Sequence, residues 1–208
     1  GIDVQDPVTI FDRSAVRRHR DRAAAKLTDY DFLLREVADR LGDCLLDFKR
    51  GFPTALDLGS HGGQLARILA GRGGIEWLLQ SDLSPAMLAQ ANGPRLAADE
   101  EALPFADGRF DLILSVLSLH WVNDLPGALT QIRRALKPDG LFLAAMLGGD
   151  TLEELRQALL GGEVEVRGGA SPRVSPFVDP HDAGALLQRA GFALPVVDTD
   201  RIVLSYTD

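Results

Sequence analysis

The stretch Ala55-Leu-Asp-Leu-Gly-Ser-His-Gly-Gly-Gln-Leu-Ala66 decides the fold of this chain. A short apolar run ends at Asp57, small residues follow, and a helical pattern opens at about Gln64. A strand, a glycine loop and a helix in this order indicate a nucleotide-binding turn, because glycines let the backbone approach a ligand closely. The alternative is an ordinary tight turn between a strand and a helix.

The spacing within this loop indicates which nucleotide it suits. A dinucleotide fingerprint would need glycines at positions 59, 61 and 64, but His61 and Gln64 occupy the last two. No Gly-Lys-Ser/Thr ending of a P-loop is present. What remains is Asp57-x-Gly59-x-His61-x-Gly63, close to the D-x-G-x-G-x-G pattern of class I S-adenosylmethionine (SAM) methyltransferases, with His61 at the middle glycine.

Length and charge limit the class of protein. The 208 residues suffice for one domain with a substantial core, and the net charge of −8 argues against nucleic-acid binding. No apolar run approaches the roughly 20 residues of a membrane span, and no signal peptide opens the chain. The single cysteine, Cys44, excludes an internal disulfide and favours a buried core thiol. We therefore expect a cytoplasmic protein.

The first 50 residues are predicted to form a helical lid, and residues 51–208 a SAM-binding domain. Residues 10–26 resemble a basic helix in an otherwise acidic chain. This helix is either a solvated face, a lid over the cofactor or a contact for an acidic partner. Residues 29–48 follow as an amphipathic helix.

Acidic residues end or follow the next two predicted strands. Strand 75–81 ends at Asp82, and a carboxylate there can accept hydrogens from both ribose hydroxyls of a nucleoside. Strand 96–98 is followed by Asp99, placed to accept from an adenine amino group, and by Glu100, whose backbone would reach the ring edge. Leu83 would pack against the adenine face. The alternatives are a plain cap at Asp82 and a bare acidic turn at Asp99.

A fourth predicted strand, 110–115, delivers Ser115 and His120 to the same edge of the sheet. The ordinary pKa of histidine suits proton transfer near neutrality, so His120 is a candidate general base. The alternative role for His120 is to position substrate or shape a wall. Trp121 stacks on adenine or substrate, or belongs to the core.

The remaining pattern completes an α/β fold. Ser84 and Asp124 open helices, a turn at 137–140 precedes a strand at 141–147, and an insertion is expected at about 151–178. Further predicted elements are helices at 152–160 and 179–190 and an antiparallel hairpin at 194–198 and 201–205. The fold class is a doubly wound, seven-stranded Rossmann-like sheet, mostly parallel, with a C-terminal antiparallel hairpin.

Several strings carry a family resemblance over nearly the whole chain. Asp57-Leu-Gly59, Asp82, Asp99 to Phe105 and Leu136-Lys-Pro-Asp-Gly140 resemble a seven-stranded SAM-dependent methyltransferase. Phe11-Asp-Arg13, Leu117-Ser-Leu-His-Trp-Val-Asn-Asp-Leu-Pro126, Gly148-Gly-Asp-Thr-Leu152 and Ser175-Pro-Phe177 resemble the methyltransferase-like assembly factors of respiratory complex I. The same strings resemble bacterial relatives of the malonyl-carrier-protein methyltransferase of biotin synthesis.

The resemblance implies SAM as cofactor and leaves three functions open. The first is methylation of a small-molecule or carrier-bound acceptor. The second is modification, by hydroxylation, of an arginine on a complex I subunit, which for a mitochondrial relative would take place in the matrix. The third is a non-catalytic SAM-binding scaffold. Two departures from the family are His61 in the glycine loop and a chain that stops at Asp208.

No metal site is predicted. The four histidines show no spacing that would bring at least three ligands together or form a 2-His-1-carboxylate iron centre.

Overall fold

Five parallel strands form the centre of the computed structural model, which describes residues 12–25, 31–116, 118, 122–145, 192–197 and 202–207. They run in the spatial order β3-β2-β1-β4-β5, and each pairs with its neighbour in parallel. The strands are β1 (Thr54–Leu58), β2 (Trp77–Asp82), β3 (Arg95–Ala97), β4 (Phe110–Val116) and β5 (Leu136–Ala145). Continuous apolar runs suit such strands because both faces of the sheet are covered.

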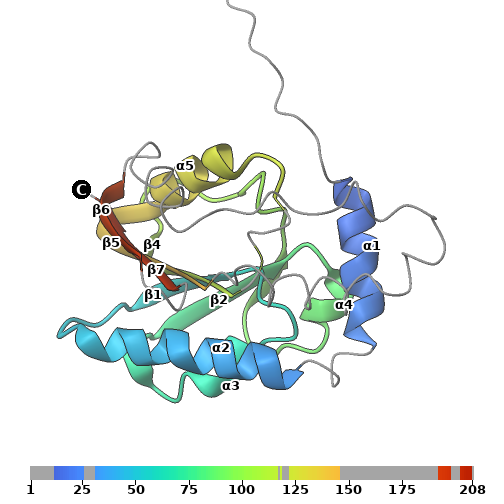
Figure 1. The fold of residues 1–208 in the computed structure, drawn as a ribbon, viewed down its shortest axis with the longest axis horizontal. Coiled ribbons are helices and arrows are strands. Elements are labelled where there is room, and N and C mark those ends of the chain that lie inside the picture. The colour runs from blue at the N-terminus through green and yellow to red at the C-terminus, as the bar shows by residue number, and fades with distance from the viewer. Residues whose placement is uncertain are drawn as a thin grey trace, which may run out of the picture.

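Helices cover both faces of this sheet (Figure 1). On one face lie α2 (Asp31–Cys44), the short 3₁₀ helix η2 (Leu45–Asp47) and α3 (Gln64–Ile68). On the other lies α5 (Leu125–Ala135), whose Leu129 and Ile132 pack against β1, β4 and β5. The doubly wound α/β architecture with a parallel sheet is therefore confirmed.

Two helices lie together at one end of the sheet (Figure 1). The basic helix α1 (Arg13–Ala24) packs on α4 (Pro85–Leu88), the short helix that follows β2. Gln90, just after α4, donates from Nε2 to the backbone oxygen of Ala24 at 2.6 Å. The predicted basic helix is thus present, and it docks on the molecule rather than standing free.

The order of the strands reverses at β1, which pairs with β2 on one side and β4 on the other. In open α/β sheets, ligands bind beyond the carboxyl ends of the strands at such a reversal. The glycine loop follows β1 at this edge, and Asp82 is the last residue of β2. The fold therefore gathers the predicted cofactor residues at one place.

Some predicted boundaries are wrong. The turn expected at 137–140 is part of β5, which begins at Leu136 directly after α5. Its pairing with β4 shifts register between the pairs Phe110–Leu136 and Leu112–Leu141, and Asp139 has a φ of 65°. A bulge of this kind lets a turn-like sequence stay within a strand.

Two further strands, β6 (Phe192–Val197) and β7 (Ile202–Thr207), come from the C-terminal part of the chain. β7 pairs antiparallel with β5, and β6 pairs antiparallel with β7. The helices expected at 152–160 and 179–190 and the insertion at 151–178 lie outside the described residues.

Within the described ranges, each helix is too short or too polar to cross a membrane.

Candidate functional site

The glycine loop turns sharply between β1 and α3. Gly59 has a φ of 74° and Gly63 a φ of 85°, a region that glycine enters without strain. The backbone N–H groups of Gly59 and Ser60 both donate to Ser81 O at 2.8 Å, which fixes the loop to the end of β2. A Cβ at Gly63 would lie 2.8 Å from Gln80 Oε1, so this position is also packed too closely for a side chain.

His61 fits the middle of this loop in the left-handed region, with a φ of 51°. Its backbone N–H donates to Asp82 Oδ2 at 2.9 Å, and its ring Nε2 lies 2.7 Å from Val116 O at the end of β4. Burial lowers the pKa of His61 below its ordinary value, although the charge of Asp82 opposes this. The ring is therefore neutral near pH 7 and donates its Nε2 hydrogen to the carbonyl.

Asp82 is fully buried at the end of β2. Besides the bond from His61, its Oδ1 accepts from the backbone N–H of Ser84 at 2.9 Å. Ser84 in turn accepts from Met87 N at 3.1 Å, which confirms the predicted N-cap of α4. Asp82 thus belongs to the turn that starts α4 and also faces the glycine loop.

Asp57 lies beside Asp82 with an exposed fraction of 1%. Neither of its carboxylate oxygens has a hydrogen-bond partner in the described structure. Burial and the charge of Asp82 raise the pKa of Asp57 to about 8. A buried carboxyl group without a donor is suited to a ligand that supplies a positive charge or a hydrogen.

Ser115 and Ser118 form the wall of the site at the end of β4. Their hydroxyl oxygens are 2.7 Å apart, and Ser118 Oγ donates to Leu58 O at 3.1 Å. A Cβ at Gly59 would lie 2.2 Å from the Cβ of Ser118. Gly59 is therefore required by the close approach of Ser118, just beyond the end of β4, a contact that the sequence did not predict.

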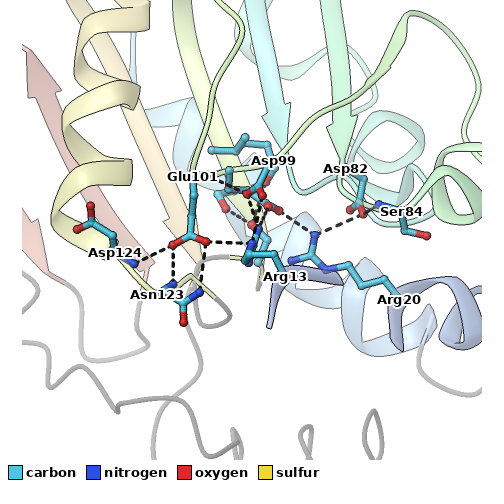
Figure 2. Close-up of polar contacts among 12 residues, drawn as sticks. Arg13, Arg20, Asp82, Ser84, Asp99, Glu101, Asn123 and Asp124 are labelled. Atoms are coloured by element: carbon cyan, nitrogen blue, oxygen red, sulfur yellow. Dashed lines mark hydrogen bonds and ion pairs between the residues drawn. The ribbon is translucent and has the colours of Figure 1, made fainter. Parts of the chain in front are cut away.

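The acidic turn after β3 is held by an arginine of α1 (Figure 2). Arg13 Nη2 contacts Asp99 Oδ1 and Glu100 Oε2, both at 2.7 Å, and its Nε contacts Glu101 Oε2 at 3.0 Å. Burial would raise the pKa of Asp99 and of Glu100, but the arginines of α1 lower both below their ordinary values. These carboxylates are therefore charged at neutral pH.

A second arginine of α1, Arg20, reaches further into the site (Figure 2). Its Nη1 donates to Glu100 Oε1 at 2.8 Å and to Asp82 Oδ1 at 3.4 Å. Burial alone would lower the pKa of Arg20, but Glu100 and Asp82 together raise it above its ordinary value. Neither arginine was predicted from the sequence to belong to this site. The signal for them was the combination of a basic helix with several acidic residues at strand ends, because such groups are expected to pair.

Glu101 connects the acidic turn to the start of α5. Its Oε1 accepts from the backbone N–H groups of Asn123 and Asp124, each at 2.9 Å (Figure 2). Asp124 caps α5 by accepting from Gly127 N at 3.0 Å, as the sequence predicts for this helix start. The chain entering α5 is thus fixed to the turn that carries Asp99.

The structure brings together most of the predicted site. The predicted residues that meet at the carboxyl edge of the sheet are Asp57, Gly59, His61, Asp82, Glu100 and Ser115. Asp99 joins them through Arg13, Gly63 lies at the start of α3, and Leu83 is half-buried directly after Asp82. His120 and Trp121 lie outside the described residues. Within the part of the chain that is described, no three or more His, Cys, Asp or Glu side chains are grouped to hold a metal ion.

Comparison with known proteins assigns the chain to a family. The model of the methyltransferase domain family matches residues 56–144, which run from β1 into β5. A malonyl-[acyl-carrier protein] O-methyltransferase of Laribacter hongkongensis is 40% identical over 214 residues, which cover 95% of this chain and 70% of that protein. The chain belongs to the class I SAM-dependent methyltransferase family.

Within this methyltransferase family, the chain is also similar to the human mitochondrial arginine-hydroxylase NDUFAF5. The identity is 46% over 206 residues, which cover 96% of this chain and 59% of that protein. The chain thus spans about 60% of the length of this relative. Both groups named by the sequence resemblance, the assembly-factor relatives and the carrier-protein methyltransferases, are confirmed as relatives.

A solved structure shows the same fold. The phosphoethanolamine N-methyltransferase 2 of Haemonchus contortus, in complex with S-adenosylhomocysteine, aligns with a TM-score of 0.66 at 20% identity. The alignment covers 88% of this chain and 45% of that one. The predicted Rossmann-like methyltransferase fold is therefore confirmed, and SAM is the cofactor expected of the family.

Proposed function

We propose that this chain is a SAM-dependent methyltransferase that acts on a small-molecule or carrier-bound acceptor. The observation that carries the proposal is the meeting of Asp82, the glycine loop and the Asp99 turn at one edge of the sheet. This edge lies where the strand order reverses, and the 40% identity to a carrier-protein methyltransferase favours the same chemistry.

The residues present fit this cofactor. Asp82 would accept from the ribose hydroxyls, Asp99 and the Glu100 backbone would bind adenine, and Leu83 would pack on its face. The unpartnered carboxyl of Asp57 fits the ammonium group of the cofactor. When bound, SAM supplies a methyl group on a sulfonium. The task of the chain is then to orient an acceptor in line with that group and to exclude water.

His120 is our candidate for the residue that faces the acceptor, either as general base or as a positioning group. A base is needed only where the acceptor must lose a proton early, as an alcohol does and a carboxylate does not. The partners expected on this basis are a small molecule or a carrier protein.

A second candidate function is modification of an arginine on a partner protein such as a respiratory complex I subunit. The 46% identity to a protein named arginine-hydroxylase favours it. Under this proposal the same pocket holds the cofactor, and the site of action is the mitochondrial matrix. Under the first proposal it is the cytoplasm.

We further propose that β6 and β7 complete a seven-stranded sheet with a C-terminal antiparallel hairpin, which the pairing of β7 with β5 supports. The division at residue 50 into a lid and a cofactor domain stays a prediction. The contacts of α1 with Asp82, Glu100 and Asp99 favour a lid role for this helix.

Two measurements test these proposals. Calorimetric titration with SAM, NAD and ATP should give binding of SAM alone, and binding of NAD or ATP in its place would contradict the pocket assignment. Incubation with SAM and a malonyl-loaded carrier protein should then form S-adenosylhomocysteine. A gain of one oxygen atom on an arginine-containing partner peptide, without S-adenosylhomocysteine, would establish the second function instead.

A further inference from the structure

Arg20 is a buried cation with a hydrogen-bonding group left over. Its exposed fraction is 7%, and its Nη1 satisfies both Glu100 and Asp82. Its Nη2 is buried and has no partner among the described residues. A buried donor without an acceptor is unfavourable, so this group is suited to an oxygen atom that the protein itself does not supply.

Asp82, which Arg20 contacts through Nη1, can accept more hydrogen bonds than it does in this structure. A carboxylate has about four lone-pair positions. Two of these accept short bonds of 2.9 Å from the backbone N–H groups of His61 and Ser84. Arg20 takes a third through a contact of 3.4 Å, which is long for a charged pair. Asp82 can therefore accept two hydroxyl hydrogens if this long contact is released.

A ribose diol matches these two groups. Each hydroxyl donates one hydrogen and also offers lone pairs that accept hydrogen bonds, so a carboxylate alone satisfies the donor and leaves the lone pairs unpaired. We propose that Arg20 is a cofactor-binding residue whose free Nη2 donates to the ribose hydroxyl oxygens, while Asp82 accepts the hydroxyl hydrogens. This inference rests on the proposed function, because that function places the ribose at Asp82.

The alternative is that Arg20 merely competes with the ribose for Asp82. The way in which Arg20 is held by Glu100 favours a role in binding instead. The 2.8 Å bond from Arg20 to Glu100 does not involve Asp82, and Arg13 donates to the other carboxylate oxygen of Glu100 at 2.7 Å. The guanidinium can therefore release Asp82 and remain beside it. Helix α1 then contributes directly to the cofactor site and does not merely cover it.

The test compares two ligands that differ only in the ribose hydroxyls. S-adenosylhomocysteine and its 2′,3′-dideoxy analogue are titrated by calorimetry into the wild type, Arg20→Met and Arg18→Met. The wild type should prefer the ribose form, and Arg20→Met should reduce this preference about tenfold. Arg18→Met is the matched control, because Arg18 is exposed on the same helix and should leave the preference unchanged.

Two further variants separate the possible failures. Arg20→Lys keeps the positive charge beside Glu100 but loses the planar guanidinium, so it should also reduce the preference for the ribose form. This variant keeps the test possible if Arg20→Met does not fold. Asp82→Asn should reduce the preference for the ribose form as well, because it removes the carboxylate that accepts the hydroxyl hydrogens. If Asp82→Asn does so while both Arg20 variants keep the preference or bind both ligands more tightly, the inference is wrong and the proposed function stands. A wild type that binds neither ligand overturns both.

Discussion

Asp57 carries a carboxyl group that the fold buries without a hydrogen-bond donor among the described residues. Burial and the nearby charge of Asp82 raise its pKa from an ordinary 3.8 to about 8. Such a group costs stability when it is charged, and proteins accept this cost at sites where a ligand later provides the missing partner. At the scale of single residues, Asp57 is the clearest sign of a binding function in this chain.

The first prediction concerns the pH dependence that Asp57 imposes. The folded protein keeps a proton that the unfolded chain loses above about pH 4, so the free energy of unfolding falls as pH rises from about 4 to about 8. Asp57→Asn cannot titrate and should lose this slope, which is at most about 1.4 kcal/mol per pH unit. Urea unfolding of the ligand-free protein at several pH values measures this pH dependence. If the free energy of unfolding changed with pH in the same way in wild type and variant, the raised pKa of Asp57 would be contradicted.

At the scale of elements, the β1–loop–α3 turn is fixed by the strands on both sides. Its N–H groups bond to the end of β2 through Ser81, and Ser118, beyond the end of β4, fills the space above Gly59. The loop therefore depends on strands 20 to 60 residues away, not only on its own glycines.

The second prediction compares two glycines that both have a positive φ. Gly59→Ala should destabilise the protein by about 2–5 kcal/mol, because strain at a positive φ adds to the overlap with Ser118. Gly108→Ala is the control, since Gly108 has a φ of 65° with open space around its Cβ position, and it should cost only about 1–2 kcal/mol. Thermal unfolding measures both, and equal losses would show that the close approach of Ser118 does not matter.

At the scale of the whole molecule, α2 belongs to the core. Leu34, Ala38 and Leu41 are buried against the sheet in a cluster that also contains residues of β1, β4 and β5. Arg72 fixes α2 from outside through Asp39 at 2.9 Å and Asp43 at 2.8 Å. The two described helices of the first 50 residues therefore differ in their packing: α1 contacts the acidic residues at the carboxyl edge of the sheet, and α2 packs in the core against one face of the sheet.

The third prediction tests this arrangement. Leu41→Ala should lower the free energy of unfolding by about 2–5 kcal/mol, because Leu41 is fully buried in the core that the sheet shares. Leu46→Ala is the control, since Leu46 is 65% exposed and its loss should change stability by no more than about 0.5 kcal/mol. A small effect of Leu41→Ala on the unfolding of the sheet would instead support a separate lid that includes α2.

Much of the site follows from local pattern. Apolar runs that end in Asp57 and Asp82, small residues after the first run, and Ser84-Pro85 at a helix start define strands, loop and cap without any long-range information. Since parallel strands end at one edge, these residues had to meet there. The sequence could also predict that His61 sits in the loop, but not that its ring bonds to Val116 O.

What the amino-acid sequence alone determined is the order of elements and the edge at which the acidic residues gather, because both depend on periodicity and on turn residues close in the chain. Only the tertiary structure decided that Arg13 and Arg20 pair with carboxylates 62 to 88 residues away, and that Ser118 leaves room for nothing but glycine at position 59. The reason is that such contacts depend on how α1 docks and how β4 approaches β1. Packing across the molecule, rather than any local pattern, sets these distances.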